Sequence, residues 1–360
     1  MVAVALNDAA SRRQFFQRRV LANLQYWQTW LAGKLNDTAA LDRERNGLIR
    51  AISYALELDE AWDMAFELID KLAPYMERRG YWDSWQWVLE QGLKIAQRRE
   101  DAHQLATLHH LLARLALRQS RSQEGVSHYR RAIRFSRQVG DYFSEGRACT
   151  NLGFYYIEQG NLYRAEVLCL HALRLFKDIS SNHGLAHTEN HLGLLYTRLG
   201  RWAEAKRHLE LACSIWNSMN DDKGLVDGYM NLGVLYLEME RPECSLFWSE
   251  KALHQAKRTG DELAIGRILN NFGIAYLQSG NLEEAESNIL KAETIANRYS
   301  YLLGLAQTWD SLGTVYHEQK KLDKAIHYLE KSRELHCDLG NKSGELKILA
   351  ELALVKEKHF

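Results

Sequence analysis

Polar side chains return every forty residues at one position of the predicted helices, where they could hold a peptide. The position is occupied by Asn151, His191, Asn231, Asn271 and Ser311. Asparagine is mildly unfavourable inside a helix, because its amide competes for backbone hydrogen bonds, so its recurrence needs a reason. An amide offers donors and an acceptor, so a row of amides can pair with the backbone of an extended peptide of any sequence. The alternative is that these amides cap or bridge neighbouring helices within the fold.

Two further positions of the repeat lie on the same predicted helix face. In three of the units, the residue just before the first position is Asn190, Asn270 or Asp310. In two of the units, His187 and Arg267 lie four residues before the first position. Residues spaced three, four and seven apart share one face of a helix. We therefore predict a peptide-binding groove formed by Asn151, His187, Asn190, His191, Asn231, Arg267, Asn270, Asn271 and Asp310.

An arginine-rich segment precedes this region. Between Ala102 and Gln138 there are seven arginines and one acidic residue, Glu124. Because guanidinium groups bind carboxylates and phosphates in a bidentate manner, the segment suits an acidic peptide. The alternative is a solvated face whose charges pair with nearby acids. Nucleic acid is the less favoured partner, because only two aromatic residues, Tyr129 and Phe135, stand among the arginines. The predicted basic patch consists of Arg114, Arg118, Arg130, Arg134 and Arg147.

Metal and enzyme chemistry find little support in the residue pattern. His183, His187 and His191 lie four residues apart, so two imidazoles could share a metal ion. No Cys, Asp or Glu completes that set, because Glu189 points elsewhere by helical angle. The phosphate-binding, dinucleotide-binding, serine-hydrolase and zinc-protease motifs are absent. We predict a non-enzymatic chain with no metal site and no cofactor.

The elements that position these side chains form a repeat. Leu152-Gly153 returns as Leu192-Gly193, Leu232-Gly233, Phe272-Gly273 and Leu312-Gly313, each forty residues after the last. Apolar residues at three- and four-residue spacing predict two amphipathic helices per unit. Turns are predicted at Gly160-Asn161, Gly200-Arg201 and Gly280-Asn281. The small residues allow the paired helices to approach closely. The sequence therefore predicts an all-α solenoid of antiparallel helix pairs.

One unit resembles a known repeat family. Trp309-x-x-Leu312-Gly313-x-x-Tyr316, followed by Ala325-x-x-x-Leu329, resembles the tetratricopeptide repeat. The other units lack the tryptophan, and the usual closing proline is missing. The forty-residue length resembles repeats of kinesin light chains, of peptide-sensing bacterial regulators and of sensor regions of bacterial signalling ATPases. The resemblance implies a right-handed superhelix whose groove grips peptide backbones at the positions of Asn151, Asn231 and Asn271.

The repeat register predicts three parts of the chain. Residues 1–61 form an N-terminal helical cap, residues 62–341 form seven repeats, and residues 342–360 form a C-terminal capping helix. Six of the ten tryptophans lie in the first 90 residues. We interpret them as packing residues of the cap. The alternative is a docking surface for a partner domain.

The composition limits the remaining function classes. The 46 basic and 46 acidic side chains exclude a globally basic nucleic-acid binder and a polyacidic tail. Residues 1–140 carry 21 basic and 16 acidic side chains, net +5, and the rest carry 25 and 30, net −5. Five cysteines without a close pair indicate free thiols in a reducing compartment. No apolar stretch reaches the length of a membrane helix.

These observations predict a cytoplasmic interaction module. Its groove is expected to bind an extended peptide or partner segment, as the sensor or scaffold arm of a bacterial signalling system, and the basic patch would suit an acidic partner. The alternative is a regulator whose superhelix changes shape when it binds a signalling peptide, since each repeat of a solenoid touches only its neighbours. The oligomeric state and the partner's identity are left open by the sequence.

Overall fold

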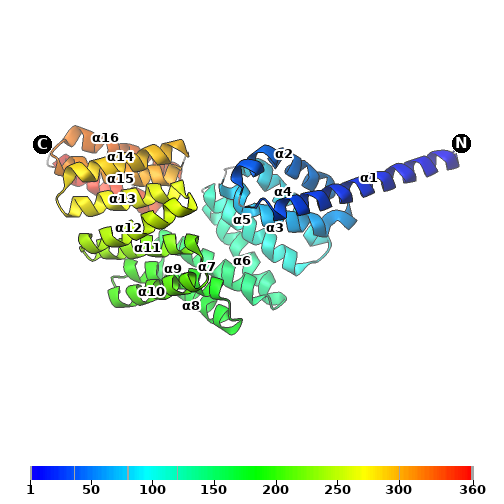
Figure 1. Cartoon of the computed structure of the whole chain (residues 1–360), viewed down its shortest axis with the longest axis horizontal. Helices are drawn as coiled ribbons and strands as arrows, with labels where there is room; N and C mark the ends of the chain where they lie inside the picture. The colour runs from blue at the N-terminus through cyan, green and yellow to red at the C-terminus, as the bar shows by residue number, and fades with distance from the viewer. Residues whose placement is uncertain (1, 36, 79–80, 120, 300, 358–360) are drawn as a thin grey trace. The chain divides into compact units, whose positions relative to one another are not determined.

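The computed structural model describes residues 2–35, 37–78, 81–119, 121–299 and 301–357, and these residues contain no β-strand. Consecutive helices are joined by short turns and pack against each other as pairs. The predicted all-α solenoid of antiparallel helix pairs is confirmed. Figure 1 shows successive pairs stacked on one another from α9–α10 to α15–α16. No helix in the described part of the chain is long and apolar enough to span a membrane.

The chain divides into two compact units, Met1–Ser144 and Glu145–Phe360. The first unit holds α1 (Val2–Ala32), α2 (Thr38–Ala55), the short 3₁₀ helix η1 (Asp59–Ala61), α3 (Trp62–Arg78), α4 (Trp82–Arg98), α5 (Ala102–Arg118) and α6 (Ser122–Gln138). Helix α7 (Tyr142–Glu158) begins in the first unit and continues in the second.

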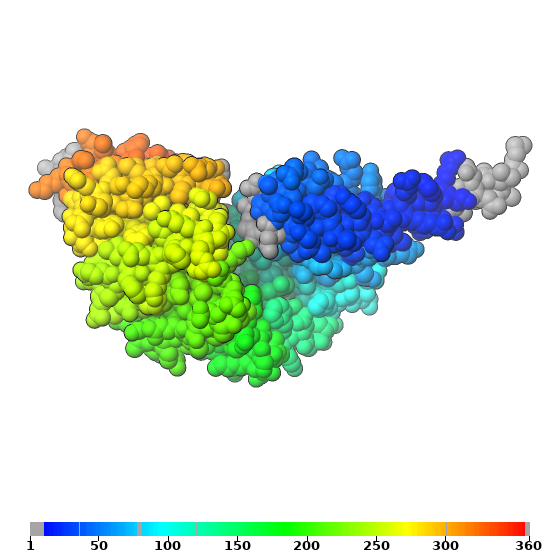
Figure 2. Space-filling model, in the orientation of Figure 1, coloured from blue at the N-terminus to red at the C-terminus, as the bar shows by residue number. Residues whose placement is uncertain are grey.

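The second unit continues with ten further helices of nearly equal length. They are α8 (Leu162–Asp178), α9 (Asn182–Arg198), α10 (Trp202–Ser218), α11 (Asp222–Glu238), α12 (Pro242–Thr259), α13 (Glu262–Gln278), α14 (Leu282–Arg298), α15 (Leu302–Glu318), α16 (Leu322–Asp338) and α17 (Lys342–Glu357). In the space-filling view these helices form a closely packed body, coloured from green to orange (Figure 2).

The turns between helices repeat every twenty residues, and local sequence specifies them. A left-handed residue follows the helix, as at Gly160, Gly200 and Gly280, which confirms the predicted turns. At the turn after α10, the backbone N–H of Asp221 donates to the Trp216 carbonyl at 2.9 Å. The Asp221 carboxylate in turn accepts from the Gly224 N–H at 3.0 Å and caps α11.

The helices of a pair cross closely at the recurring glycines. A Cβ atom placed on Gly193 would lie 2.5 Å from Leu209 Cδ2, and one on Gly273 would lie 2.2 Å from Ile289 Cγ1. Both distances are shorter than real Cβ atoms tolerate. The small residues at these crossings therefore serve the packing role expected from the sequence.

Several large aromatic side chains lie in the mainly aliphatic core of the first unit. Trp62 and Trp85 are fully buried and Trp27 is nearly so, whereas Trp87 is exposed. The Trp62 indole N–H donates to Gln104 Oε1 at 2.5 Å, which pairs its one polar atom. The burial of three of these tryptophans agrees with a packing role. The three-part division at residues 61 and 341 remains a prediction.

Candidate functional site

The first helices of successive pairs form one side of the second unit. Helices α9, α11 and α13 each contact the next first helix as well as their own partner, and α15 packs against α13 and α16. The predicted groove residues lie on these helices and on α7. We call this set of predicted positions the inner row.

Two amides of the inner row bind each other. Asn231 Nδ2 on α11 donates to Asn190 Oδ1 on α9 at 3.0 Å, and Asn190 is buried. This hydrogen bond ties two neighbouring repeats together. For this pair, the observed contact is the bridge between neighbouring helices that sequence reasoning offered as the alternative to peptide binding.

Three other polar atoms of the row are buried without a hydrogen-bond partner among the described residues. They are Asn270 Oδ1 on α13, His191 Nδ1 on α9 and Asp310 Oδ1 on α15. Asn151 and Asn271 are half-buried. Buried polar atoms are nearly always hydrogen-bonded, so an unpaired acceptor such as Asn270 Oδ1 marks a place for an added donor.

The histidines on α9 pack against aromatic rings. The His187 ring lies edge-on to Trp216 with the centroids 5.3 Å apart, and the His191 ring stacks on Phe154 at 4.8 Å. Burial, with a smaller effect of the neighbouring His183, lowers the pKa of His187 to about 4. Burial, assisted by His187, lowers the pKa of His191 to about 3. Both imidazoles are therefore neutral at pH 7.

Charged members of the row form ion pairs with adjacent helices. Arg267 Nη2 on α13 lies 3.4 Å from Asp227 Oδ1 on α11. Asp310 on α15 is contacted at 2.7 Å by the ammonium group of Lys347 on α17. The inner row is thus cross-linked along the second unit by polar contacts that helical periodicity does not predict.

The arginines of the predicted basic patch lie on three helices and have different surroundings. Arg114 and Arg118 on α5 lie 2.8 and 3.5 Å from the buried carboxylate of Glu77 on α3. Sequence reasoning missed Glu77, because it lies outside the arginine-rich segment. Arg130 and Arg134 on α6 are exposed, and the Arg134 guanidinium lies 4.8 Å from the Phe135 ring centroid. Arg147 is half-buried on α7.

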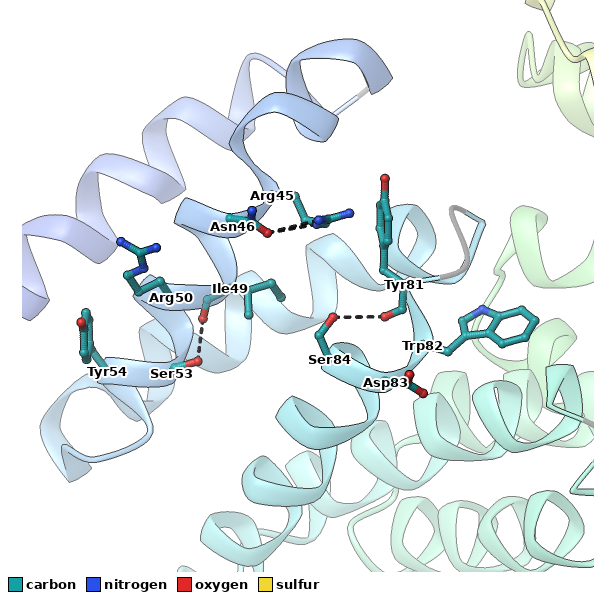
Figure 3. Close-up of a pocket in the computed structure, with 10 residues that line it drawn as sticks. All are labelled: Arg45, Asn46, Ile49, Arg50, Ser53, Tyr54, Tyr81, Trp82, Asp83 and Ser84. Carbon is teal, nitrogen blue, oxygen red and sulfur yellow. Dashed lines mark hydrogen bonds between the residues drawn. The ribbon is translucent and has the colours of Figure 1, made fainter. Parts of the chain in front are cut away.

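A hollow in the first unit was not predicted residue by residue. It measures about 700 Å³. Residues of α2 and the start of α4 line it, namely Arg45, Asn46, Ile49, Arg50, Ser53, Tyr54, Tyr81, Trp82, Asp83 and Ser84 (Figure 3). The Arg45 guanidinium lies 3.7 Å from the Tyr81 ring centroid, so its charge rests on an aromatic face. The aromatic residues near position 80 were the signal that pointed to this region.

Comparison with protein-family models identifies the type of repeat. A model described as tetratricopeptide repeat matches residues 146–218 and 265–338, both within the second unit. These two segments of the chain carry tetratricopeptide repeats. The first match covers α7 to α10 and the second covers α13 to α16, so both include helices of the inner row.

A curated relative and several solved structures are similar to this chain. The 43 kDa receptor-associated protein of the synapse from Tetronarce californica is 22% identical over 243 residues, which cover 63% of this chain and 58% of the relative. The chain therefore matches little more than half the length of that relative.

The solved structures show a shared fold at low sequence identity. Apo RapI has a TM-score of 0.62 and 16% identity, covering 76% of this chain and 98% of RapI. A Rap protein complexed with Competence and Sporulation Factor has a TM-score of 0.61 and 13% identity, covering 92% and 98%. NprR in complex with its cognate peptide NprX has a TM-score of 0.55 and 15% identity, covering 92% and 82%.

Proposed function

We propose that the inner row of the tetratricopeptide repeats binds an extended segment of a protein or peptide partner. In this role the chain would serve as the sensor or scaffold arm of a bacterial signalling system. The observation that carries the proposal is the buried, unpaired Asn270 Oδ1, beside the half-buried Asn271. A peptide N–H is a suitable donor for that oxygen. NprR, which shares the fold, was solved with its cognate peptide, and this supports the proposal.

The spacing of the row sets the length of segment it can hold. Packed helices lie about 8–10 Å apart, so α9 and α13, two steps apart in the row, are separated by roughly 20 Å. An extended chain rises about 3.3 Å per residue. A segment of about six residues would therefore reach from His191 to Asn270.

A second candidate is a regulator that changes shape when a peptide binds. The contacts Asn190–Asn231 and Asp227–Arg267 link neighbouring repeats across the row. A peptide that competed for these side chains would alter the links between repeats. Because each repeat of a solenoid touches mainly its neighbours, small changes at each link add up along the array.

Further parts of the proposal concern the setting of this module. We propose that the exposed Arg130 and Arg134 favour an acidic partner, and that the chain acts without catalysis or cofactor in the reducing cytoplasm. Its five cysteines are free thiols, three of them buried, which is consistent with that compartment. The division into an N-terminal cap, seven repeats and a capping helix belongs to the same proposal.

Binding of the full chain to an array of six-residue peptides tests this function. We expect the wild-type chain to select a subset of the peptides. The double variant Asn270→Ala/Asn271→Ala should bind them roughly thirtyfold more weakly, because two hydrogen bonds worth about 1 kcal/mol each are lost. Asn231→Ala/Asn271→Ala should weaken binding similarly, with an added small loss of stability from the broken contact with Asn190.

A matched asparagine serves as the control. Asn288 is half-buried on α14, outside the inner row, and its amide donates to the Glu284 carbonyl at 2.8 Å, so Asn288→Ala should bind as wild type. Circular dichroism checks that all variants are folded. The proposal is contradicted if the wild-type chain selects no peptide from the array. It is also contradicted if the double variants bind the peptides as tightly as the wild-type chain does. X-ray scattering with and without a selected peptide separates the two candidate functions. A regulator that changes shape should show a different molecular size with the peptide bound, whereas a simple binding module should not.

A further inference from the structure

Three side chains of metal-binding chemistry converge inside the first helix pair of the second unit. Glu145 and Cys149 lie one turn apart on α7, and His171 lies on α8. A carboxylate oxygen, the thiol sulfur and an imidazole nitrogen of these residues all lie within 4.8 Å of one another. His171 Nε2 is 2.7 Å from Glu145 Oε1. The inner row does not include any of the three.

The repeat itself shows that packing does not require these residue types. The positions equivalent to Glu145 in the next four repeats hold Leu185, Leu225, Ile265 and Leu305. A carboxylate that is only 2% exposed therefore stands where the same fold elsewhere uses an aliphatic side chain. Burial of a charge is costly unless it is compensated. His171 likewise occupies the position of Leu211, Lys251, Lys291 and Lys331.

We propose that Glu145, Cys149 and His171 form a binding site for one zinc-class divalent cation. Thiolate sulfur, imidazole nitrogen and carboxylate oxygen are the ligands that Zn²⁺ prefers in proteins. The thiolate and the carboxylate together carry two negative charges, which neutralise the dication in a buried place. Among the described residues, no other group brings a thiol, an acid and an imidazole this close together.

The observed geometry is close to what the cation needs. With metal–ligand bonds of about 2.0–2.3 Å, ligand atoms of a tetrahedral site lie about 3.3–3.7 Å apart. The Glu145–His171 contact therefore has to open by about 1 Å as the cation replaces their hydrogen bond. On binding, the Cys149 thiol releases its proton to solvent, and His171 keeps one proton on Nδ1 while Nε2 binds the metal.

Water has access to the site from one side. The His171 side chain is 31% exposed, whereas the Glu145 side chain is 3% exposed and Cys149 is buried. A water molecule on the His171 side would complete the tetrahedron as the fourth ligand. The same opening provides the path by which the cation enters.

The next helix pair provides a natural comparison. Glu189 on α9 and His208 on α10 also form a buried acid–imidazole pair, with His208 Nδ1 bonded to Glu189 Oε2. No cysteine joins that pair in the set of converging ligands. The thiol of Cys149 is thus what distinguishes a cation site from an acid–histidine hydrogen bond.

Titration of the full chain with Co²⁺, followed by displacement with Zn²⁺, tests the proposal. We expect one equivalent of Co²⁺ to produce a thiolate-to-cobalt charge-transfer band, which Zn²⁺ removes. Cys149→Ser should abolish the band, and His171→Ala should weaken Co²⁺ binding by at least about tenfold. Cys213→Ser, another buried thiol, and His208→Gln, the paired histidine of the next repeat, should leave the band unchanged.

Folding of the variants is checked independently. Saturating Zn²⁺ should raise the melting temperature of the wild-type chain and not that of Cys149→Ser, provided both have the same circular dichroism spectrum without metal. A wild-type chain that gives no charge-transfer band overturns the proposal. So does a band that persists in Cys149→Ser, since the thiolate ligand would then lie elsewhere.

Discussion

The helix pairs α7 to α10 and the pairs α11 to α14 share one backbone plan but bury different chemistry. In the first group, the buried acidic and histidine side chains are Glu145, Glu189 and His208. In the second group, the buried polar side chains are Ser245, Ser249 and Gln255, none of which titrates. Both groups keep glycine at the helix crossing, at Gly153, Gly193, Gly233 and Gly273.

The comparison teaches which positions set the fold and which are free to carry chemistry. The crossing glycines, the small residues opposite them and the turns recur in both groups. The positions between them hold acids, histidines and a cysteine in one group and aliphatic residues or hydroxyls in the other. A solenoid built from a few fixed positions can therefore place a candidate cation site in one repeat without changing the next.

The largest expected effect concerns the crossings. Gly273→Ala should destabilise the second unit by about 2–3 kcal/mol, because the new Cβ would lie 2.2 Å from Ile289 Cγ1 and 3.1 Å from the Ala285 carbonyl oxygen. Gly153→Ala should cost about 1 kcal/mol or less. Its Cβ meets Cys169 Sγ at 2.7 Å and nothing else within 3.4 Å, and alanine favours the helix. Guanidinium unfolding followed by circular dichroism measures both.

The control relieves the clash directly. Adding Ile289→Ala to Gly273→Ala should cost less than the two single changes together, because the atoms that collide are removed. Equal destabilisation by Gly153→Ala and Gly273→Ala would contradict this prediction, since these two crossings would then be equally tight.

Acid should destabilise the first group more than the second. The folded chain holds His187 and His191 neutral, with pKa values of about 4 and about 3, whereas the unfolded chain takes up protons near 6.5. Stability from these groups is therefore complete above pH 6.5 and is lost as pH falls towards 4. The loss is up to about 1.4 kcal/mol per pH unit for each histidine. His183 and Asp221 face His187 and have smaller, opposing effects.

The equivalent residues of the later repeats provide the matched variant. Asn231 and Asn271 occupy the position of His191, so His191→Asn gives α9 the residue of α11 and α13. Melting temperatures recorded from pH 7.5 to pH 5 should fall less steeply in this variant than in the wild-type chain. Parallel curves would show that the His191 imidazole does not govern the acid sensitivity.

Sequence reasoning was accurate where structure depends on local patterns. The turn at Gly160-Asn161 and the crossing at Gly193 follow from residue types a few positions apart, and the structure has both. The tetratricopeptide repeat was recognisable for the same reason. Spacing along one chain segment was enough to identify these features.

Side-chain contacts between helices were harder to predict. The hydrogen bond between Asn190 and Asn231 joins residues 41 positions apart, and its geometry depends on rotamers that periodicity does not specify. The meeting of Glu145, Cys149 and His171 was missed for the same reason, because a search within one helix cannot find ligands on two. The repeat register did hold a signal, since Glu145 stands where four other repeats have Leu or Ile.

The smallest expected effect concerns the residue that follows each helix in the turn, which differs between α11 and the helices α7 and α9. Helices α7 and α9 are followed by Gly160 and Gly200 in the left-handed region, whereas α11 is followed by Glu240 with φ of 55°. A side chain in this conformation costs about 1 kcal/mol relative to glycine, partly offset by the greater freedom of glycine in the unfolded chain. Glu240→Gly should therefore stabilise the second unit by about 0.5 kcal/mol. The reverse change, Gly200→Glu, should destabilise it by a similar amount, so opposite shifts in the guanidinium midpoint are expected. If both changes lower the midpoint, the Glu240 side chain contributes more to stability than its backbone strain removes.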